Sequence, residues 1–277
     1  MTAATDLDQE QVSYQSVNDA FSKQSRYFDD EDDRNPVLQY MRAQVYKNVD
    51  KYIRPNSNIL EINAGTGIDA LRFVQCGHTV LATDLSDGMI QQIERKKELL
   101  QLKNKLRCTQ LSYENLGQLK GQKFDFVFSN MGGLNCLDDL TKVTRHLPAL
   151  LKPSARITWV VMPPTYLWEL IGLLKGNLKS AFRRFHTKGT IAHLEGEYFK
   201  TYYHSLSAIK RAFDPSFRLI GIQGLCALVP PPHLGNFPVK YPRLFNILKK
   251  IDECVHNSFP FNRWADHIIV TFEYNGK

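Results

Sequence analysis

The stretch that decides the fold is Asn58-Ile59-Leu60-Glu61-Ile62-Asn63-Ala64-Gly65-Thr66-Gly67-Ile68-Asp69-Ala70-Leu71. An apolar run enters a turn of small residues, and an amphipathic pattern resumes at Ile68. This order predicts a strand, a tight turn and a helix. Glycine at 65 and 67 suits a positive φ or a close approach of the backbone to a ligand. The free N–H groups of the following helix would point at whatever occupies the turn.

A second apolar run, residues 78–84, ends in Asp84. Gly65 and Asp84 are separated by about the 20 residues at which an acidic residue meets the ribose hydroxyls in nucleotide-binding βαβ units. Such a pair acts on one ligand only if both residues face one crevice. We therefore expect the Asp84 carboxylate to lie beside the turn that contains Gly65 and Gly67.

The chain continues as an alternation of helical patterns and apolar runs, the runs lying at 106–111, 124–130 and 156–162. This β-α alternation predicts a parallel sheet with helices on both faces. In such sheets the ligand lies beyond the carboxyl ends of the strands. Four of the chain's candidate site residues fall at those ends, namely Gly65, Asp84, Tyr113 and Asn130. Two further strands are expected at 217–228 and 266–274.

The opening stretch resembles motif I of the class I S-adenosylmethionine-dependent methyltransferases, E-x-(G/N)-x-G-x-G, through Glu61, Asn63, Gly65 and Gly67. Asn63 stands where the family usually has glycine, and asparagine is a residue that tolerates unusual φ. The segment after the fourth strand, from Asn130, resembles motif IV of that family. The resemblance is close over residues 55–162 and loose over the last sixty. It implies a Rossmann-like, seven-stranded, mostly parallel sheet with helices on both faces, an antiparallel last strand and a helical lid insertion.

The resemblance also implies S-adenosyl-L-methionine as cofactor. By matching the family's motifs, the expected cofactor-binding residues are Tyr27, Arg42, Asn63, Ala64, Gly65, Thr66, Gly67, Asp69, Asp84, Leu85, Met89, Ser112, Tyr113, Asn130, Met131 and Gly132. Tyr27 and Arg42 match the N-terminal region that touches the methionine end of the cofactor in the family. Ser112 stands where the family usually has aspartate, so the adenine amino group would depend on Ser112 or on backbone carbonyls.

We expect four parts: cofactor-covering helices in 1–54, the cofactor-binding core in 55–162, a lid in 163–204, and the rest of the core with a second helical excursion in 205–277. Residues 1–20 show no periodicity, and the acidic run 29–33 is expected to be a solvated loop because like charges resist packing. Asn35-Pro36 signals the start of a helix. Residues 137–151 are expected to form one helix.

The lid region carries the candidates for the acceptor pocket. The expected substrate-binding residues are Tyr166, Trp168, Tyr202 and Tyr203, with Phe237 beside them. The candidate general bases are His193, Glu195 and His204, although each also suits a structural role. Residues 175–188 form a basic amphipathic stretch. That stretch suits either a lid helix packed on the core or weak contact with an anionic membrane surface.

The chain has 35 Lys and Arg against 28 Asp and Glu, a net charge of +7, with the excess mostly after residue 150. Such charge attracts nucleic acid, an anionic membrane or an acidic substrate, but scattered solubilising charges give the same sum. The five cysteines form no C-x-x-C and no zinc spacing, which favours a reducing compartment. No apolar run approaches the roughly 18 residues of a membrane span, and the polar N-terminus is no signal peptide. We expect a cytoplasmic protein that binds no metal.

These observations favour a methyltransferase that acts on a small-molecule, natural-product or lipid-like O- or N-acceptor by in-line transfer. Two alternatives remain open: a non-catalytic methyltransferase-like protein that binds the cofactor or a partner, and a nicotinamide-dependent oxidoreductase. The absent third glycine of G-x-G-x-x-G speaks against the oxidoreductase. No nucleic acid is expected as partner, because the Asn130 segment lacks the D/N-P-P-Y/F pattern of amino-modifying enzymes. The sequence does not specify an oligomeric state.

Overall fold

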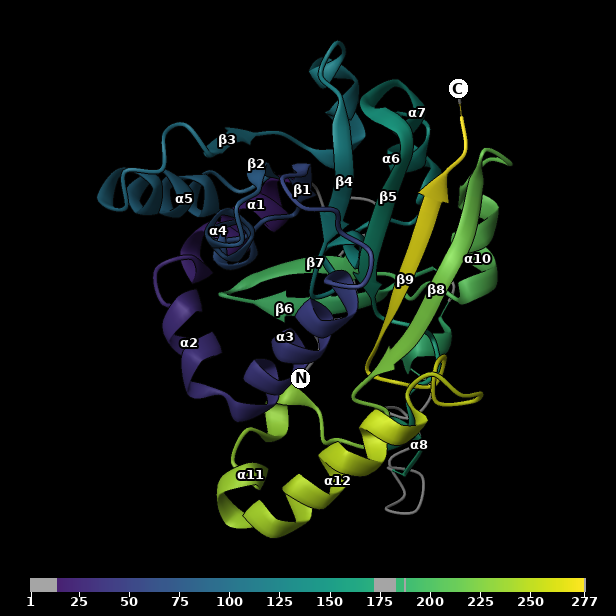
Figure 1. Cartoon of the computed structure of the whole chain (residues 1–277). Helices are drawn as coiled ribbons and strands as arrows, with labels where there is room; N and C mark the ends of the chain where they lie inside the picture. Colours follow the sequence, from purple (N-terminus) through teal and green to yellow (C-terminus); the bar gives the residue numbers. More distant parts are fainter. Residues whose placement is uncertain (1–13, 172–182, 187, 277) are drawn as a thin grey trace.

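The protein is described here by a computed structural model that covers residues 14–171, 183–186 and 188–276. Its centre is a seven-stranded sheet (Figure 1). In chain order the strands are β1 (Asn58–Ile62), β2 (Thr79–Asp84), β3 (Leu106–Gln110), β4 (Phe124–Ser129), β5 (Leu151–Val161), β8 (Phe217–Leu225) and β9 (His267–Tyr274).

The strands lie in the order β3-β2-β1-β4-β5-β9-β8. The first five pair in parallel, and β9 pairs antiparallel with both β5 and β8. The predicted Rossmann-like sheet with an antiparallel last strand is therefore confirmed. Its central strands are buried along nearly their whole length, because helices cover both faces of the sheet.

Each face of the sheet has its own apolar core. One core joins the sheet to α3 (Pro36–Val49), α4 (Ile68–Gln75) and α5 (Asp87–Leu99). The other joins it to the 3₁₀ helix η1 (Tyr113–Leu119), α6 (Thr141–Thr144), α7 (Leu147–Leu150) and α10 (Leu206–Ala212). Asn35 begins α3 as predicted, because its Oδ1 accepts hydrogen bonds from the first free N–H groups of the helix.

The expectation of one helix over 137–151 is wrong. The structure has two short helices, α6 and α7, and β5 begins already at Leu151. Pro148 stands in the first turn of α7, where its missing N–H costs nothing. Inside a continuous helix the same residue would break a hydrogen bond and clash with the preceding turn.

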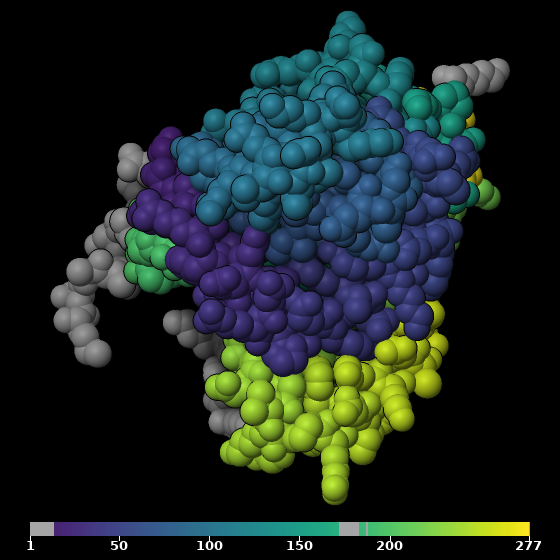
Figure 2. All heavy atoms as spheres, turned by 60° about the vertical axis from the view of Figure 1, so that its left-hand side comes forward, coloured from purple at the N-terminus to yellow at the C-terminus, as the bar shows by residue number. Residues whose placement is uncertain are grey.

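The N-terminal segment is more ordered than its sequence suggested. Within the described residues, α1 (Tyr14–Gln24) replaces the expected unstructured region up to residue 20. The acidic run expected as a solvated loop lies inside α2 (Phe28–Arg34), with Asp32 buried. Acidic side chains in the first turn of a helix favour it, because they face the positive end of its dipole. Figure 2 shows this segment, in purple, spread over one face of the molecule.

The insertion after β5 is not purely helical, which corrects the predicted helical lid. It contains α8 (Leu167–Ile171), a short turn η4 (Arg183–Phe185), and a hairpin of β6 (Thr190–Leu194) and β7 (Glu197–Thr201). Glu195 and Gly196 join the two strands with φ of 52° and 83°, the two positive values typical of a tight hairpin turn. Most of the basic stretch 175–188 lies outside the described residues.

The N-terminal helix α1 packs against both the hairpin and α5 (Figure 1). The rings of Phe21 in α1 and Phe199 in β7 lie 5.7 Å apart between centroids. At the opposite end of the molecule, α11 (Phe237–Lys240) and α12 (Pro242–Val255) form the second helical excursion. Among the described helices, none has the length and apolar character to span a bilayer.

Gly88 lets α1 approach α5 closely, and this contact can be tested. A β-carbon on Gly88 would lie 2.7 Å from Ser22 Cα and 2.8 Å from Ser22 O. Backbone atoms cannot rotate away, so we expect Gly88→Ala to displace α1 even though alanine favours a helix by about 1 kcal/mol over glycine. Tryptic cleavage at Lys23 and Arg26 should become severalfold faster.

The control for this experiment is Gln91→Ala, a change of an exposed residue on the same helix, which should leave the cleavage rate unchanged. Equal rates for Gly88→Ala and the unaltered protein would show that the close packing of α1 on α5 is not needed to hold the N-terminal segment.

Candidate functional site

The glycine turn after β1 and the carboxylate at the end of β2 meet, as the sequence predicts. Gly65 N donates a hydrogen bond to Asp84 Oδ2 at 2.8 Å, and Ser86 N donates to Asp84 Oδ1 at 2.8 Å. The turn holds φ of 57° at Asn63, 54° at Gly65 and 82° at Gly67. These are the left-handed values that asparagine and glycine adopt most readily.

Burial raises the pKa of the Asp84 carboxyl, and the backbone hydrogen bonds from Ser86, Gly65 and Leu85 oppose that rise. A carboxylate has about four lone-pair sites, so these bonds leave capacity for further donors. Asp84 is therefore fixed in position at the edge of a cavity and still able to accept hydrogen bonds from a hydroxyl pair.

A cavity of about 280 Å³ lies at the carboxyl ends of the parallel strands. Its wall is formed by the N-terminal helices, the glycine turn, the ends of β2 and β4, η1 and the hairpin. The lining residues are Val17, Phe21, Phe28, Asn63, Gly65, Asp84, Leu85, Met89, Tyr113, Asn130, Met131, Gly132, Gly133, Asn135, Cys136, Met162, Ala192, Phe199 and Thr201. Most of them are apolar, and Asp84 supplies the carboxyl group among them.

Most of the predicted cofactor residues border this cavity or a smaller one of about 40 Å³ beside it. The larger cavity is lined by Asn63, Gly65, Asp84, Leu85, Met89, Tyr113, Asn130, Met131 and Gly132. The smaller one adds Arg42, Ala64, Thr66 and Asp69. Tyr27, Gly67 and Ser112 border neither cavity. Ser112 caps η1 by accepting from Glu114 N.

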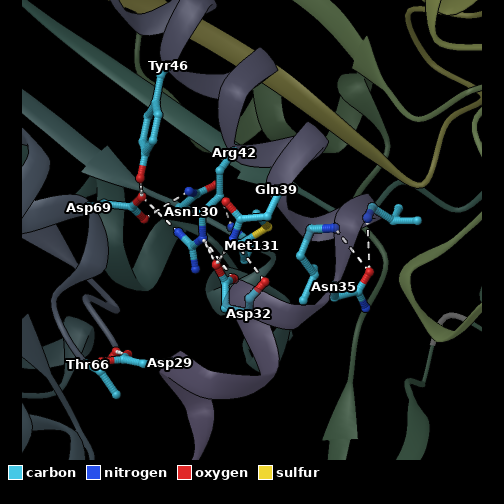
Figure 3. A network of polar contacts seen from close by, with 12 residues as sticks. Asp29, Asp32, Asn35, Gln39, Arg42, Tyr46, Thr66, Asp69, Asn130 and Met131 are labelled. Carbon is cyan, nitrogen blue, oxygen red and sulfur yellow. Dashed lines mark hydrogen bonds and ion pairs between the residues drawn. The ribbon is translucent and has the colours of Figure 1, made fainter. Parts of the chain in front are cut away.

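A buried ion-pair network stands behind the smaller cavity (Figure 3). Arg42 Nε lies 2.8 Å from both oxygens of Asp32, and its Nη1 lies 2.8 Å from Asp69 Oδ1. Tyr46 donates its hydroxyl to the same Asp69 oxygen at 2.5 Å. Arg42 had been expected to bind the cofactor carboxylate, but two carboxylates of the protein already hold these nitrogens.

The network carries opposing electrostatic effects. Burial disfavours the charged form of Arg42, but Asp69 and Asp32 outweigh it and raise the pKa of the guanidinium further above its usual value. Burial also raises the pKa of Asp32 despite the attraction of Arg42. The cation and its carboxylates therefore depend on one another, because each would be costly to bury alone.

The same network orients the end of β4. Asn130 Nδ2 donates to Asp69 Oδ2 at 2.9 Å, and Met131 N donates to Asn130 Oδ1 at 2.8 Å (Figure 3). Arg42 thus connects helices α2, α3 and α4 to the loop that follows β4.

A second contact fastens α2 over the glycine turn. Asp29 accepts from Thr66 Oγ1 at 2.5 Å and pairs with Lys96 Nζ at 2.5 Å. Lys96 Nζ also donates to the carbonyl of Thr66 at 2.8 Å. The acidic run that the sequence presented as solvent-facing thus closes the site from the N-terminal side.

The structure places none of the three candidate bases in the cavity wall. His193 is exposed on β6, where its ring lies 4.6 Å from that of Tyr198. Glu195 is exposed at the hairpin turn, within hydrogen-bonding reach of Tyr27. His204 is buried, its Nε2 lies 2.9 Å from Leu137 O, and burial lowers its pKa.

The predicted substrate residues also lie away from the cavity. Tyr166 and Tyr203 both pack against the Arg184 guanidinium, whose central carbon lies 4.8 and 5.1 Å from their ring centroids. Trp168 donates its Nε1–H to the carbonyl of Leu228 at 3.0 Å. Tyr202 borders a separate depression. Arg184, which belongs to the basic stretch 175–188, is buried.

Sequence reasoning missed the part of the wall that comes from distant segments: Val17, Phe21, Phe28, Asn135, Cys136, Met162, Ala192, Phe199 and Thr201. A signal for the hairpin was present, since residues common in strands, such as Ile191, Tyr198 and Phe199, flank Glu195-Gly196 on both sides. Such a pattern around a glycine-containing turn is typical of two paired strands. No local signal indicates that α1 would pack on that hairpin.

Comparison with known proteins agrees with this geometry. Residues 59–154 match a family described as "Methyltransferase domain". A search of curated protein sequences found no significant match. The fold is shared with a putative S-adenosylmethionine-dependent methyltransferase from Listeria monocytogenes, with a TM-score of 0.59, 16% identity, and coverage of 83% of this chain and 96% of that one.

Two other solved structures share the fold. One is a SAM-dependent methyltransferase from Methanosarcina mazei, with a TM-score of 0.57, 16% identity, and 84% and 99% of the two chains covered. The other is geranyl diphosphate C-methyltransferase from Streptomyces coelicolor A3(2) in complex with Mg²⁺, geranyl diphosphate and S-adenosyl-L-homocysteine, with a TM-score of 0.53, 14% identity, and 84% and 80% covered.

Residues 59–154 of this chain are thus a methyltransferase domain. The whole chain has the class I S-adenosylmethionine-dependent methyltransferase fold, and the family resemblance found in the sequence is confirmed.

Removing the central cation of the network should destabilise the fold strongly. Arg42→Met leaves Asp32 and Asp69 buried without their partner, and breaking a buried pair in this way typically costs about 3–5 kcal/mol. We expect a loss of that size in the free energy of unfolding, measured by urea denaturation. Arg34→Met is the matched control, because Arg34 pairs with Asp30 on the surface. A loss for Arg42→Met no larger than for this control would contradict the role assigned to the network.

Proposed function

We propose that this protein transfers the methyl group of its cofactor, S-adenosyl-L-methionine, to a small-molecule acceptor. The observation that carries the proposal is the hydrogen bond from Gly65 N to Asp84 Oδ2 at the wall of one cavity. This hydrogen bond places the glycine turn and the strand-end carboxylate at the wall of the same cavity. A bound adenosyl group requires that arrangement.

The residues present fit that cofactor. Asp84 offers its remaining lone pairs to the ribose hydroxyls, while Leu85, Met89 and Tyr113 give apolar surface for the adenine ring. The glycine turn and the Asn130 loop would hold the methionine end. When bound, the cofactor supplies a methyl group on a positively charged sulfur, so the protein has mainly to orient the acceptor and exclude water.

The mostly apolar wall supports a small acceptor. Phe21 from α1 and Phe199 from the hairpin roof the cavity, and Met162 lies at its inner side. A cavity of about 280 Å³ lies at the small end of the range for ligand pockets, which favours a compact acceptor group over a nucleotide held in a duplex. An oxygen or nitrogen atom on a natural-product or lipid-like molecule is the acceptor that we propose.

A non-catalytic protein that only binds the cofactor is the second candidate. The observation in its favour is that none of His193, Glu195 and His204 borders the cavity. A nicotinamide-dependent oxidoreductase is less well supported, because residues 59–154 match a methyltransferase domain. A fluorescence titration with NADH tests that reading directly.

The ribose assignment predicts the effect of Asp84→Ala on cofactor binding. Hydrogen bonds to a charged group contribute about 1.5–3 kcal/mol each, and every 1.4 kcal/mol or so is tenfold in affinity. The variant should therefore bind S-adenosyl-L-homocysteine at least tenfold more weakly, as measured by calorimetry. Asp139→Ala, which changes an exposed carboxylate, should bind as the unaltered protein does. Unchanged affinity in Asp84→Ala would remove the ribose assignment.

Transfer itself can be measured with cofactor that carries a labelled methyl group. Incubation with separated small-molecule, protein and nucleic-acid fractions of a lysate should place the label in the small-molecule fraction, and Asp84→Ala should reduce it at subsaturating cofactor. Tight binding of S-adenosyl-L-homocysteine without label in any fraction would favour the non-catalytic reading.

A further inference from the structure

Asp266 and His267 form a buried pair beside the cavity, at the start of β9. His267 Nδ1 lies 3.0 Å from Asp266 Oδ2. Both residues are more than nine-tenths buried. The other ring nitrogen, His267 Nε2, is inaccessible to solvent and has no hydrogen-bond partner among the described residues. A buried polar atom without a partner is rare in a folded protein and calls for a physical explanation.

Asp266 is itself held by a buried cation. Arg184 Nη2 lies 2.8 Å from Asp266 Oδ1, and Arg184 Nη1 donates to the Asp266 carbonyl at 2.9 Å. Burial alone would raise the pKa of Asp266, but His267 and Arg184 outweigh it and hold that pKa well below the usual range. The carboxylate therefore stays ionised across the physiological pH range. Among the described residues, the other titratable groups near this pair are Tyr166, Glu169, Arg183, Tyr203 and Cys226.

An ionised Asp266 fixes the state of the imidazole. The carboxylate can only accept, so Nδ1 must carry a proton and donate it. In the neutral ring the remaining nitrogen, Nε2, then presents a lone pair. An adjacent carboxylate also stabilises the imidazolium that forms when Nε2 takes up a proton. The pair is thus arranged as a base whose reactive atom is Nε2.

Nε2 lies behind the inner wall of the cavity, against Gly132, and His267 itself is not among the lining residues. A β-carbon placed on Gly132 would lie 3.1 Å from His267 Nε2, 3.2 Å from Met162 Cε and 3.3 Å from Asn135 Oδ1. Gly132, Met162 and Asn135 all line the cavity. Gly132 leaves open the space that any side chain would fill. The Met162 thioether is the movable part of this wall, because methionine has three rotatable bonds.

The titratable residues of the cavity wall itself are poor bases. Asp84 is held in place by Gly65 N and Ser86 N, and its remaining lone pairs are assigned to the ribose hydroxyls of the cofactor, so it is not free to act on the acceptor. Burial raises the pKa of Cys136 to about 12 and raises that of Tyr113 well above its usual value, so both keep their protons at neutral pH. The three bases expected from sequence lie elsewhere. His267 does not line the cavity either, but its Nε2 stands directly behind the lining residue Gly132 and has a lone pair suited to accept a proton.

We propose that His267 is the general base of this site, positioned by Asp266, and that the acceptor arrives with a proton on the atom that becomes methylated. This inference rests on the proposed methyl transfer. The acceptor, an alcohol, phenol or amine, gives its proton to His267 Nε2. Its electron pair forms the bond to the methyl carbon, while the carbon–sulfur bond breaks and leaves its pair on sulfur. The imidazolium then returns the proton to solvent.

The position of the lone pair can be tested without knowing the acceptor. Methyl 4-nitrobenzenesulfonate is a small reagent that methylates an imidazole nitrogen bearing a lone pair. In the unaltered protein with S-adenosyl-L-homocysteine bound, we expect methylation of His267 at Nε2, located by mass spectrometry of the peptide. Absence of the modification at His267 while exposed histidines react would show that Nε2 cannot be reached from the cavity and would overturn the proposal.

The role in transfer is tested with His267→Gln, since a general base typically contributes about 10²–10⁴-fold. Labelling of the small-molecule fraction should slow by at least a hundredfold, while affinity for S-adenosyl-L-homocysteine changes less than twofold. His233→Gln, at an exposed position, is the control for both measurements. Equal transfer rates in His267→Gln and the unaltered protein would refute the base, whereas no transfer by the unaltered protein would refute the proposed function instead.

Asp266→Asn tests the positioning role separately. Asparagine keeps the shape but removes the charge that fixes the tautomer, so the reagent should methylate His267 more slowly and at both ring nitrogens. Selective methylation at Nε2 in Asp266→Asn, at the unaltered rate, would show that Asp266 does not set the state of the imidazole. The methylation experiment on the unaltered protein needs no variant. It therefore still tests the proposal if a substituted chain folds poorly.

Discussion

The site depends on one buried cation, the guanidinium of Arg42. Its ion pairs with Asp32 and Asp69 join α2, α3 and α4, and through Asp69 they orient Asn130 after β4. A buried pair of this kind often adds little net stability, because desolvation offsets the attraction. The network acts instead on geometry. Both carboxylates can be buried only where the guanidinium contacts them, and this requirement fixes where the N-terminal segment packs.

The sheet could be predicted because its signals are local. Apolar runs, glycine turns and helix caps each occupy a few adjacent residues, and the Gly65–Asp84 contact follows from a fixed spacing within one βαβ unit. The lid could not be predicted in the same way. The contact of Phe21 with Phe199 joins segments that lie far apart in the chain. The prediction that the acidic run is a solvated loop is wrong. Asp32 and Asp29 instead pair with residues of α3, α5 and the glycine turn.

Small residues determine how closely these distant parts approach. A β-carbon on Gly133 would lie 2.5 Å from Asn63 Cβ, so the loop after β4 rests directly on the turn after β1. Gly88 plays the corresponding role between α5 and α1. The sequence presents these glycines as turn or helix residues, and only the packing shows that their missing side chains bring the walls of one cavity together. A glycine in the sequence thus predicts a turn more readily than it predicts a close contact between distant segments.

The antiparallel direction of β9 explains why the sequence does not point to His267. Ligands of such sheets gather at the carboxyl ends of the parallel strands, so the sequence marks residues that follow those strands as candidates. Because β9 runs the other way, its first residues, not its last, lie at that edge: Ile268 pairs with Val161, the final residue of β5. His267 therefore reaches Met162 and Gly132 from the amino end of a strand, where the rule for parallel strands gives no reason to look.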